Sequence, residues 1–308
     1  MRIVTANPTG LCFGVRRAIE ELEAALRQAG TVYALGSPIH NPQEIARLEG
    51  LGLVVTENPE EIPDGAVVFV RAHGVGPKVL ADLQRRAVRV VDGTCPFVRS
   101  AQERAGRLSS EGYVVLLVGD RDHPEVRGIR GYVEGEAFVC HGVEDLPPDR
   151  AFDKVGVVCQ TTQREATLRA VVGALVPRAR ELRVFNTICR ATVERQESIR
   201  RLAEEVRHIV VIGGRNSANT RKLVEIARNA GADVQSIEHA GELDGGWLAE
   251  KDRIGVAAGA STPDWLIHQL ISILATPRSS RGTDGNDGDS RGNGKPGNVW
   301  CGAGRTGR

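Results

Sequence analysis

One local pattern occurs three times in this chain: a short β-branched run ends, a cysteine follows, and a charged amphipathic helix is predicted to begin. The cysteines are Cys12, Cys95 and Cys189, in GLCFGVRRAIE, DGTCPFVRSAQ and NTICRATVERQ. A thiol at a helix N-terminus lies at the positive end of the backbone dipole and is expected to lose its proton more readily. Three such thiols predict one metal site that the three copies share.

The spacing of polar residues after each cysteine is also repeated. A histidine or serine comes 28 residues after each cysteine, in a polar turn that follows a predicted strand. A second polar residue follows a later strand, 61, 66 and 72 residues after the respective cysteine. The first set is His40, His123 and Ser217, and the second set is His73, Thr161 and Ser261. The common interval predicts three copies of one structural unit.

The order of predicted elements indicates an α/β fold. Short apolar strands, centred on 31–35, 67–70, 113–118, 155–159, 209–212 and 254–258, alternate with helical segments. This predicts three similar α/β lobes with mostly parallel central sheets in a pseudo-threefold arrangement, at 1–91, 92–184 and 185–276. Ligands of open α/β sheets bind beyond the carboxyl ends of the strands, where the polar residues of both sets lie. The three lobes are therefore expected to face one pocket.

Composition limits the classes of function. The formal net charge is +1, so no basic field favours nucleic acid or an anionic membrane surface. No apolar run approaches the roughly 18 residues of a membrane span, and the N-terminus does not resemble a signal peptide. Six cysteines without an export signal are expected to be reduced, which predicts a cytoplasmic protein. Residues 277–308, rich in Gly, Ser, Asp, Asn and Arg, predict a disordered tail, with Trp300 and Cys301 outside the site.

The cysteine pattern favours an iron–sulfur cluster over zinc. A structural zinc ion is bound by four ligands, often in C-x-x-C pairs, and the chain has no such pair. Three widely separated thiolates suit a cubic cluster, normally held by four, and leave one iron open to bind substrate. Cys140 and Cys159 end apolar runs and are interpreted as packed structural thiols.

The polar residues suit a phosphate-bearing ligand held by side chains, because the chain has neither GxxxxGK[ST] nor GxGxxG. Imidazole N–H groups, hydroxyl groups and the amide of Asn219 are suitable donors. Arg71 and Arg215 are interpreted as surface charges. Glu125, in His-Pro-Glu, has two interpretations that stay open: a carboxylate that stabilises a helix start, or a general acid whose pKa is raised in a dry pocket.

These motifs resemble those of the 4-hydroxy-3-methylbut-2-enyl diphosphate reductase family, which acts last in the methylerythritol phosphate route to isoprenoids. The resemblance covers about residues 1–275. It is carried by nine motifs in order: GLCFGVRRAIE, GSPIHNP, RAHGV, DGTCPFV, GDRDHPEV, QTTQ, NTICRATVERQ, RNSANT and GAST.

The resemblance implies an oxygen-sensitive enzyme with three lobes around one 4Fe–4S cluster. The cluster ligands would be Cys12, Cys95 and Cys189, with one iron open. The groups that bind diphosphate would be His40, His73, His123, Ser217, Asn219 and Ser261. Thr161 would lie near the substrate hydroxyl, and Glu125 would donate the proton. The reaction implied is reductive removal of an allylic hydroxyl, with electrons from a ferredoxin or flavodoxin, giving isopentenyl and dimethylallyl diphosphate.

Three positions depart from the family pattern. Ala218 stands where a second serine is usual, which removes one hydroxyl donor, and Gly93 and Cys159 are also unusual. Two other classes compete with the resemblance. One is a dehydrating condensing enzyme of the quinolinate synthase type, which would turn over without a reductant. The other is a non-catalytic iron–sulfur or zinc carrier or sensor.

Overall fold

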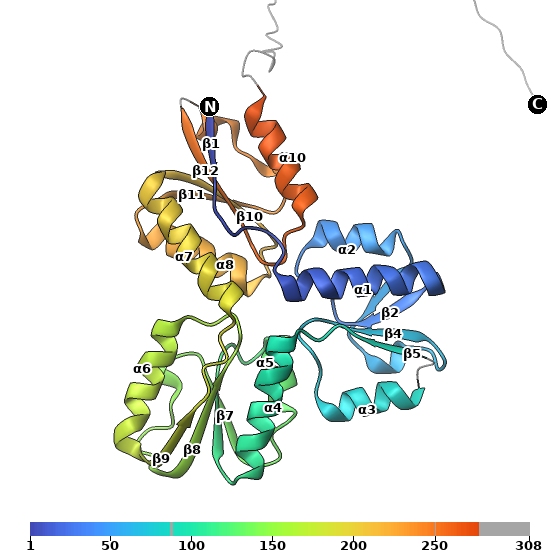
Figure 1. Cartoon of the computed structure of the whole chain (residues 1–308), viewed down its shortest axis with the longest axis vertical. Helices are drawn as coiled ribbons and strands as arrows, with labels where there is room; N and C mark the ends of the chain where they lie inside the picture. The colour runs from blue at the N-terminus through green and yellow to red at the C-terminus, as the bar shows by residue number, and fades with distance from the viewer. Residues whose placement is uncertain (87–88, 250, 277–308) are drawn as a thin grey trace, which may run out of the picture. The chain divides into compact units, whose positions relative to one another are not determined.

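The computed structural model describes residues 1–86, 89–249 and 251–276. Residues Met1–Ala275 form one compact unit that contains three four-stranded sheets (Figure 1). Every strand pair in these sheets is parallel. The predicted α/β class with three mostly parallel sheets is thus confirmed. The predicted tail at 277–308 lies outside the described residues.

The first sheet has the strand order β3-β2-β4-β5. Its strands are β2 (Val32–Leu35), β3 (Leu53–Thr56), β4 (Val67–Val70) and β5 (Arg89–Asp92), and its helices are α1 (Phe13–Ala29), α2 (Pro42–Glu49) and α3 (Pro77–Arg86). The amphipathic helix α1 buries Ala18, Leu22 and Leu26 against one face of this sheet, while Leu83 of α3 covers the other. Burial on both faces explains why the strands are short continuous apolar runs.

The second sheet has the order β7-β6-β8-β9. Its strands are β6 (Val114–Val118), β7 (Ala137–Cys140), β8 (Phe152–Cys159) and β9 (Ala179–Val184), and its helices are α4 (Pro96–Ser110), α5 (Pro124–Arg130) and α6 (Glu165–Leu175). Side chains of β6 alternate between its two faces, as strand geometry requires. Val115 and Leu117 pack with α4 and α5, while Leu116 and Val118 pack with α6.

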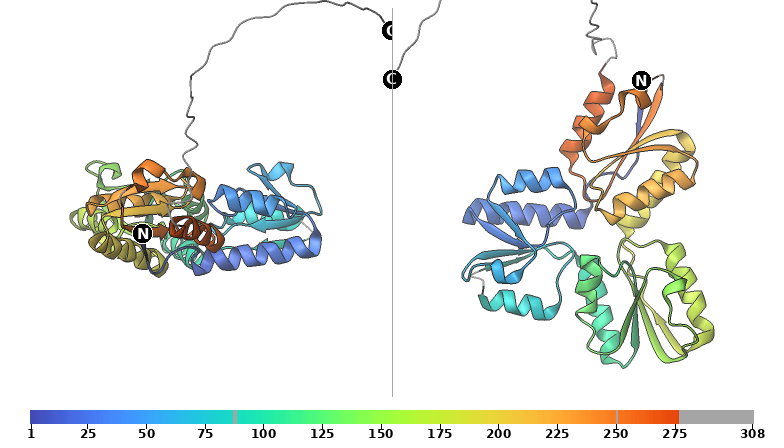
Figure 2. Two further views of the ribbon diagram at one scale, coloured as in Figure 1. Left: turned by 90° about the horizontal axis from the view of Figure 1, so that it is seen from above. Right: turned by 180° about the vertical axis from the view of Figure 1, so that it is seen from behind.

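The third sheet has the order β1-β12-β10-β11. Its strands are β1 (Arg2–Thr5), β10 (His208–Ile212), β11 (Asp233–Ile237) and β12 (Arg253–Ala258), and its helices are α7 (Arg190–Glu205), α8 (Ala218–Asn229), α9 (Gly245–Leu248) and α10 (Asp264–Ala275). Helices α7 and α8 pack on one face and α10 on the other (Figure 2). No helix of the described residues is long and apolar enough to cross a membrane.

The predicted first lobe, residues 1–91, includes strand β1, but the structure places β1 in the third sheet. It pairs with β12 of the third sheet, with Arg2 opposite Arg253. The chain continues along that sheet, where the Thr9 hydroxyl accepts the N–H of Ala258 (2.7 Å). An apolar run specifies a strand but not its partner, because pairing is decided by which sheet edge the folded chain leaves open. The other lobe boundaries stay a prediction.

Candidate active site

A cavity of about 90 Å³ lies where loops from all three sheets meet. Its lining includes every residue that the sequence placed in a site: Cys12, His40, His73, Cys95, His123, Glu125, Thr161, Cys189, Ser217, Asn219 and Ser261. Most of these residues follow the carboxyl end of a strand, as expected for ligand sites of parallel sheets. The predicted co-location is therefore observed, while the role of each residue stays a prediction.

Each of the three cysteines is the N-cap residue of a long helix: Cys12 of α1, Cys95 of α4 and Cys189 of α7. The backbone N–H of each cysteine donates to a carbonyl in the loop after a strand. The acceptors are Ala260 for Cys12 (3.2 Å), Ala72 for Cys95 (3.0 Å) and Thr161 for Cys189 (3.0 Å). Ala260 directly precedes Ser261, and Ala72 directly precedes His73. Thr161 itself belongs to the second set of polar residues. The repeat therefore includes a bond that fixes each thiol against a polar loop.

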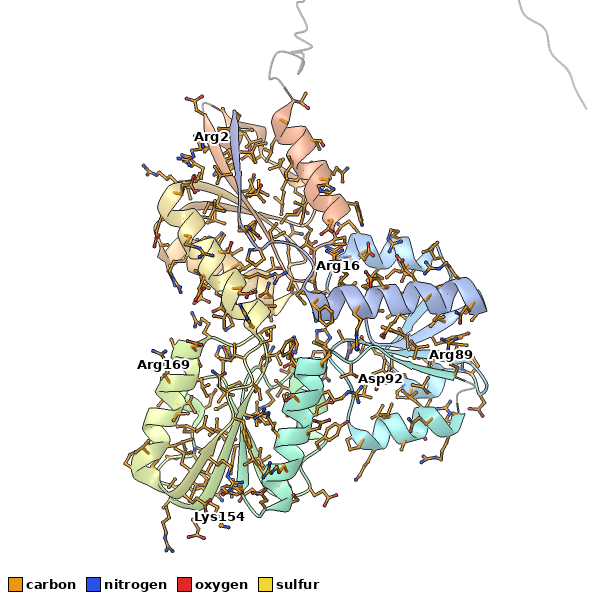
Figure 3. The ribbon with its side chains drawn as sticks, in the orientation of Figure 1. Arg2, Arg16, Arg89, Asp92, Lys154 and Arg169 are labelled. Atoms are coloured by element: carbon orange, nitrogen blue, oxygen red, sulfur yellow. The ribbon has the colours of Figure 1, made fainter. Side chains whose placement is uncertain are left out.

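The helix ends also touch one another across the lobes. A Cβ atom on Gly14, in the first turn of α1, would overlap the Sγ atom of Cys95. Arg17 of α1 donates to the carbonyl of Thr94 (2.8 Å). Arg16, which is labelled on the same helix in Figure 3, pairs with Asp264 at the start of α10 (3.0 Å). These contacts hold the first thiol loop against the other two sheets.

The expectation that the helix ends make these thiols more acidic is wrong for two of the three. Burial raises the pKa of Cys189 to about 11 and also raises the pKa of Cys95, and this effect exceeds the opposite effect of nearby backbone N–H groups. Removal from water penalises the thiolate more than the helix end stabilises it. A bound cation would favour deprotonation of Cys95 and Cys189, as metal binding normally does.

The three histidines form a compact cluster. One ring nitrogen from each of His40, His73 and His123 lies within 4.8 Å of the others. Burial, followed by neighbouring positive groups, lowers the pKa values of His40 and His123 to about 4, and it lowers that of His73 well below its usual range. All three rings are therefore neutral near pH 7. Both ring nitrogens of His40 and Nδ1 of His73 are buried with no hydrogen-bond partner, which leaves them available to a ligand.

The tautomer of His123 is decided by its own helix. His123 is the N-cap residue of α5, and its Nδ1 accepts the backbone N–H of Glu125 (3.2 Å). A neutral ring that accepts at Nδ1 carries its proton on Nε2. His123 therefore offers the cavity an N–H donor and no lone pair.

Polar groups from the third sheet complete this side of the cavity. The Ser261 hydroxyl lies 3.2 Å from that of Ser217, which is the N-cap residue of α8. Both amide atoms of Asn219 are buried without a partner. Buried polar groups are nearly always hydrogen-bonded, so an unpartnered amide facing a cavity indicates a place for a polar ligand.

Glu125 is bound to Thr161. The backbone N–H and the hydroxyl of Thr161 donate to Oε1 (2.6 Å) and Oε2 (3.0 Å) of Glu125. Glu125 is only 1% exposed, and burial raises its pKa to about 7 despite these two bonds. This pKa lies in the range in which a carboxyl group can act as a general acid near neutral pH, while the role of Glu125 stays a prediction.

The sequence did not indicate that two arginines in this region, Arg71 and Arg195, are removed from solvent. Arg71 was interpreted as a surface charge, but its guanidinium packs over Gly36, its Nε is buried without a partner, and burial lowers its pKa. Its positive charge also acts on all three histidines. Arg195 of α7 is 5% exposed and bonds the carbonyl of Gly10, two residues before Cys12. Arg215, in contrast, is exposed and pairs with Glu238 and Glu242, as a surface charge does.

The remaining departures have packing explanations. A Cβ atom on Gly93 would lie 2.5 Å from the ring of Phe69, so the core leaves no room for a side chain there. Cys140 and Cys159 are buried, with exposures of 1% and 0%, which confirms that they are packed thiols. Burial raises the pKa of each to about 12, so both thiols stay protonated near neutral pH.

Comparison with known proteins identifies the family. The family model described as LytB protein matches residues 3–275, nearly all of the described chain. This chain belongs to the LytB protein family. The resemblance indicated by the nine motifs is thereby confirmed.

Relatives of this LytB chain are named 4-hydroxy-3-methylbut-2-enyl diphosphate reductase. The protein of Geobacter sulfurreducens is 48% identical over 274 residues, which cover 89% of this chain and 97% of the relative. That of Aquifex aeolicus is 43% identical over 276 residues, covering 88% and 95%. A solved structure of (E)-4-hydroxy-3-methyl-but-2-enyl diphosphate reductase, the terminal enzyme of the non-mevalonate pathway, is 41% identical with a TM-score of 0.68, covering 89% and 99%. The reductase of Plasmodium falciparum is 25% identical with a TM-score of 0.82, covering 90% and 89%.

Proposed function

We propose that this LytB chain is a 4-hydroxy-3-methylbut-2-enyl diphosphate reductase that acts last in the methylerythritol phosphate route. It would convert (E)-4-hydroxy-3-methylbut-2-enyl diphosphate to isopentenyl diphosphate and dimethylallyl diphosphate in the cytoplasm. One observation supports the proposal independently of family membership. Three helix-capping thiols, a cluster of neutral polar donors and the Glu125–Thr161 pair all line one cavity.

The cofactor would be one 4Fe–4S cluster held by Cys12, Cys95 and Cys189, with one iron open to substrate. Among residues 1–86, 89–249 and 251–276, the histidine cluster is the one group close enough together to hold a single ion. The three thiols line the same cavity without forming such a group, so their spacing does not suit one zinc ion. A cube, whose irons lie at different corners, holds its thiolates farther apart. When bound, the cluster would supply electrons and a Lewis-acidic iron for the hydroxyl end of the substrate.

The histidine cluster would bind the diphosphate end of the substrate. A metal ion there would need a lone pair from each ring, but Nδ1 of His123 already accepts a bond and Nε2 carries the proton. An oxyanion needs N–H donors, which this arrangement supplies. The hydroxyls of Ser217 and Ser261 and the amide of Asn219 would add further donors, and the Arg71 charge favours an anion. Fixing the diphosphate in this way would hold the hydroxyl end in one position.

Glu125 would deliver the proton through Thr161. In its protonated form Glu125 can donate to the Thr161 oxygen, while the Thr161 hydroxyl donates to the leaving hydroxyl of the substrate. The overall change is R–OH + 2 e⁻ + 2 H⁺ → R–H + H₂O, in which a C–O bond breaks and a C–H bond forms. A ferredoxin or flavodoxin would supply the two electrons.

An anaerobic assay tests this proposal. Cluster-loaded protein with a low-potential reductant is expected to consume the hydroxylated allylic diphosphate and to release the two five-carbon diphosphates, measured by chromatography. Omitting the reductant is the control, because a dehydrating enzyme would turn over without electrons. No consumption by protein with full iron and sulfide would overturn the proposal, and zinc without sulfide would indicate a carrier or structural protein.

Restoring the missing serine is expected to tighten substrate binding. Ala218 lines the cavity at the first position of α8, directly after Ser217. One added hydrogen bond contributes about 1 kcal/mol, so Ala218→Ser should lower KM roughly fivefold with kcat nearly unchanged. Steady-state kinetics measures this, with Ala230→Ser at the exposed end of α8 as the control. An unchanged KM would mean that the diphosphate does not reach the start of α8.

A further inference from the structure

Arg195 is a buried cation that links two of the three thiol loops. It lies in α7, whose N-cap residue is Cys189. Its Nη2 and Nε donate to the carbonyl of Gly10 (2.8 and 3.2 Å), and its Nη1 donates to the carbonyl of Ala191 (3.0 Å). The guanidinium is therefore held between the loop that carries Cys12 and the helix start that carries Cys189.

In the part of the chain that the structure describes, no carboxylate forms an ion pair with Arg195. The hydrogen-bond acceptors of Arg195 are the backbone carbonyls of Gly10 and Ala191, and the neighbouring Glu194 pairs with Arg190 instead. Burying an unpaired charge costs several kcal/mol, so buried arginines normally face an anion. The guanidinium lies between the loop of Cys12 and the helix start of Cys189, and both thiols, followed by Glu194, favour its charged form against the effect of burial.

A bound cluster would give the buried guanidinium of Arg195 the negatively charged partner that it lacks among the described residues. Arg195 is held between the loop of Cys12 and the helix start of Cys189, so a thiolate-bound cluster there would place negative charge beside its buried guanidinium. A cluster held by three thiolates is anionic and gains one more negative charge on each one-electron reduction. A fixed cation nearby stabilises the reduced form more than the oxidised form, since the interaction grows with the charge. Charge near a cluster is a known determinant of its reduction potential.

We propose that Arg195 is the counter-cation of the iron–sulfur cluster and raises its reduction potential, in addition to joining the loops of Cys12 and Cys189. This inference rests on the proposed cluster. It makes Arg195 a positioning and tuning residue that touches no substrate.

Replacement of Arg195 separates the charge from the hydrogen bonds. Arg195→Gln removes the charge and keeps an amide donor for Gly10, whereas Arg195→Lys keeps the charge and loses the planar fork. The protein is purified and loaded anaerobically, and the midpoint potential is measured by a redox titration followed by electron paramagnetic resonance. Arg200→Gln, an exposed arginine of the same helix, is the control.

The potential of Arg195→Gln is expected to be more negative than that of wild type, while Arg195→Lys and Arg200→Gln stay close to wild type. A tenfold loss of preference for the reduced form corresponds to about 59 mV for one electron. If Arg195→Gln does not hold iron but Arg195→Lys does, the charge is still the feature required. An unchanged potential in Arg195→Gln, or equal losses of iron in Arg195→Gln and Arg195→Lys, would overturn the proposal. Absence of a cluster from the wild-type protein would instead contradict the proposed function.

Discussion

Replacing Cys12, Cys95 or Cys189 by serine, one at a time, is expected to abolish turnover and most of the bound iron and sulfide. A serine hydroxyl stays protonated near neutral pH and is a poor ligand for iron in place of a thiolate. The protein should nevertheless remain folded, because each cysteine is a helix N-cap residue and serine is among the best residues at that position. Iron and sulfide analysis, with circular dichroism to confirm the fold, measures the result.

The two buried cysteines provide the matched controls. Cys140→Ala and Cys159→Ala remove thiols that lie in the core of the second lobe, away from the cavity lining. Each should lose a modest amount of stability, about 1 kcal/mol, and keep its cluster and activity. A serine variant of Cys12, Cys95 or Cys189 that holds full iron and turns over normally would remove that residue from the ligand set.

Glu125→Gln is expected to lower kcat about 10²- to 10⁴-fold while the protein still binds cluster and substrate. An amide can accept the Thr161 N–H and meet the Thr161 hydroxyl, so both present contacts are retained. It cannot deliver a proton, and positioned proton transfer contributes about this factor. Because Glu125 has a pKa of about 7, wild-type kcat/KM should fall above pH 7, and this fall should be absent from the residual activity of the variant. Turnover near the wild-type rate would remove Glu125 from the acid role.

The same substitution is expected to stabilise the metal-free protein at alkaline pH. The folded-state pKa of Glu125 is about 7, above the ordinary value of 4.5. The unfolded chain therefore releases this proton at lower pH than the folded protein, and the folded protein loses stability as pH rises from 4.5 through 7. Relative to wild type, Glu125→Gln should therefore gain stability between pH 5 and pH 8, by up to about 3 kcal/mol. Urea denaturation at the two pH values measures this difference.

Glu44→Gln is the control for burial of a carboxyl group. Glu44 is 3% exposed, but it pairs with Arg47 (2.6 Å) and accepts the Trp265 Nε1–H (2.9 Å). Removing that carboxylate breaks the ion pair of a buried glutamate with an exposed arginine and should destabilise the protein at pH 8. A Glu125→Gln variant that also lost stability at pH 8 would contradict the raised pKa of Glu125.

The sequence by itself determined the three repeated units, the position of each cysteine at a helix start, and the placement of the polar residues after strands. These features depend on local preferences and on spacing along the chain, which a sequence displays directly. Residues with regular spacing from Cys12, Cys95 and Cys189 do line one cavity, because equal units with parallel strands present equivalent loops.

Only the tertiary structure decided which groups are removed from water. It placed β1 in the third sheet, buried Arg71 and Arg195 among groups distant in sequence, and reversed the expected effect on the pKa values of Cys95 and Cys189. Burial depends on the packing of distant segments, and its cost to a charge exceeds the effect of a helix end. The helix starts therefore indicated where the thiols are, but only the folded protein showed that burial raises the pKa values of Cys95 and Cys189.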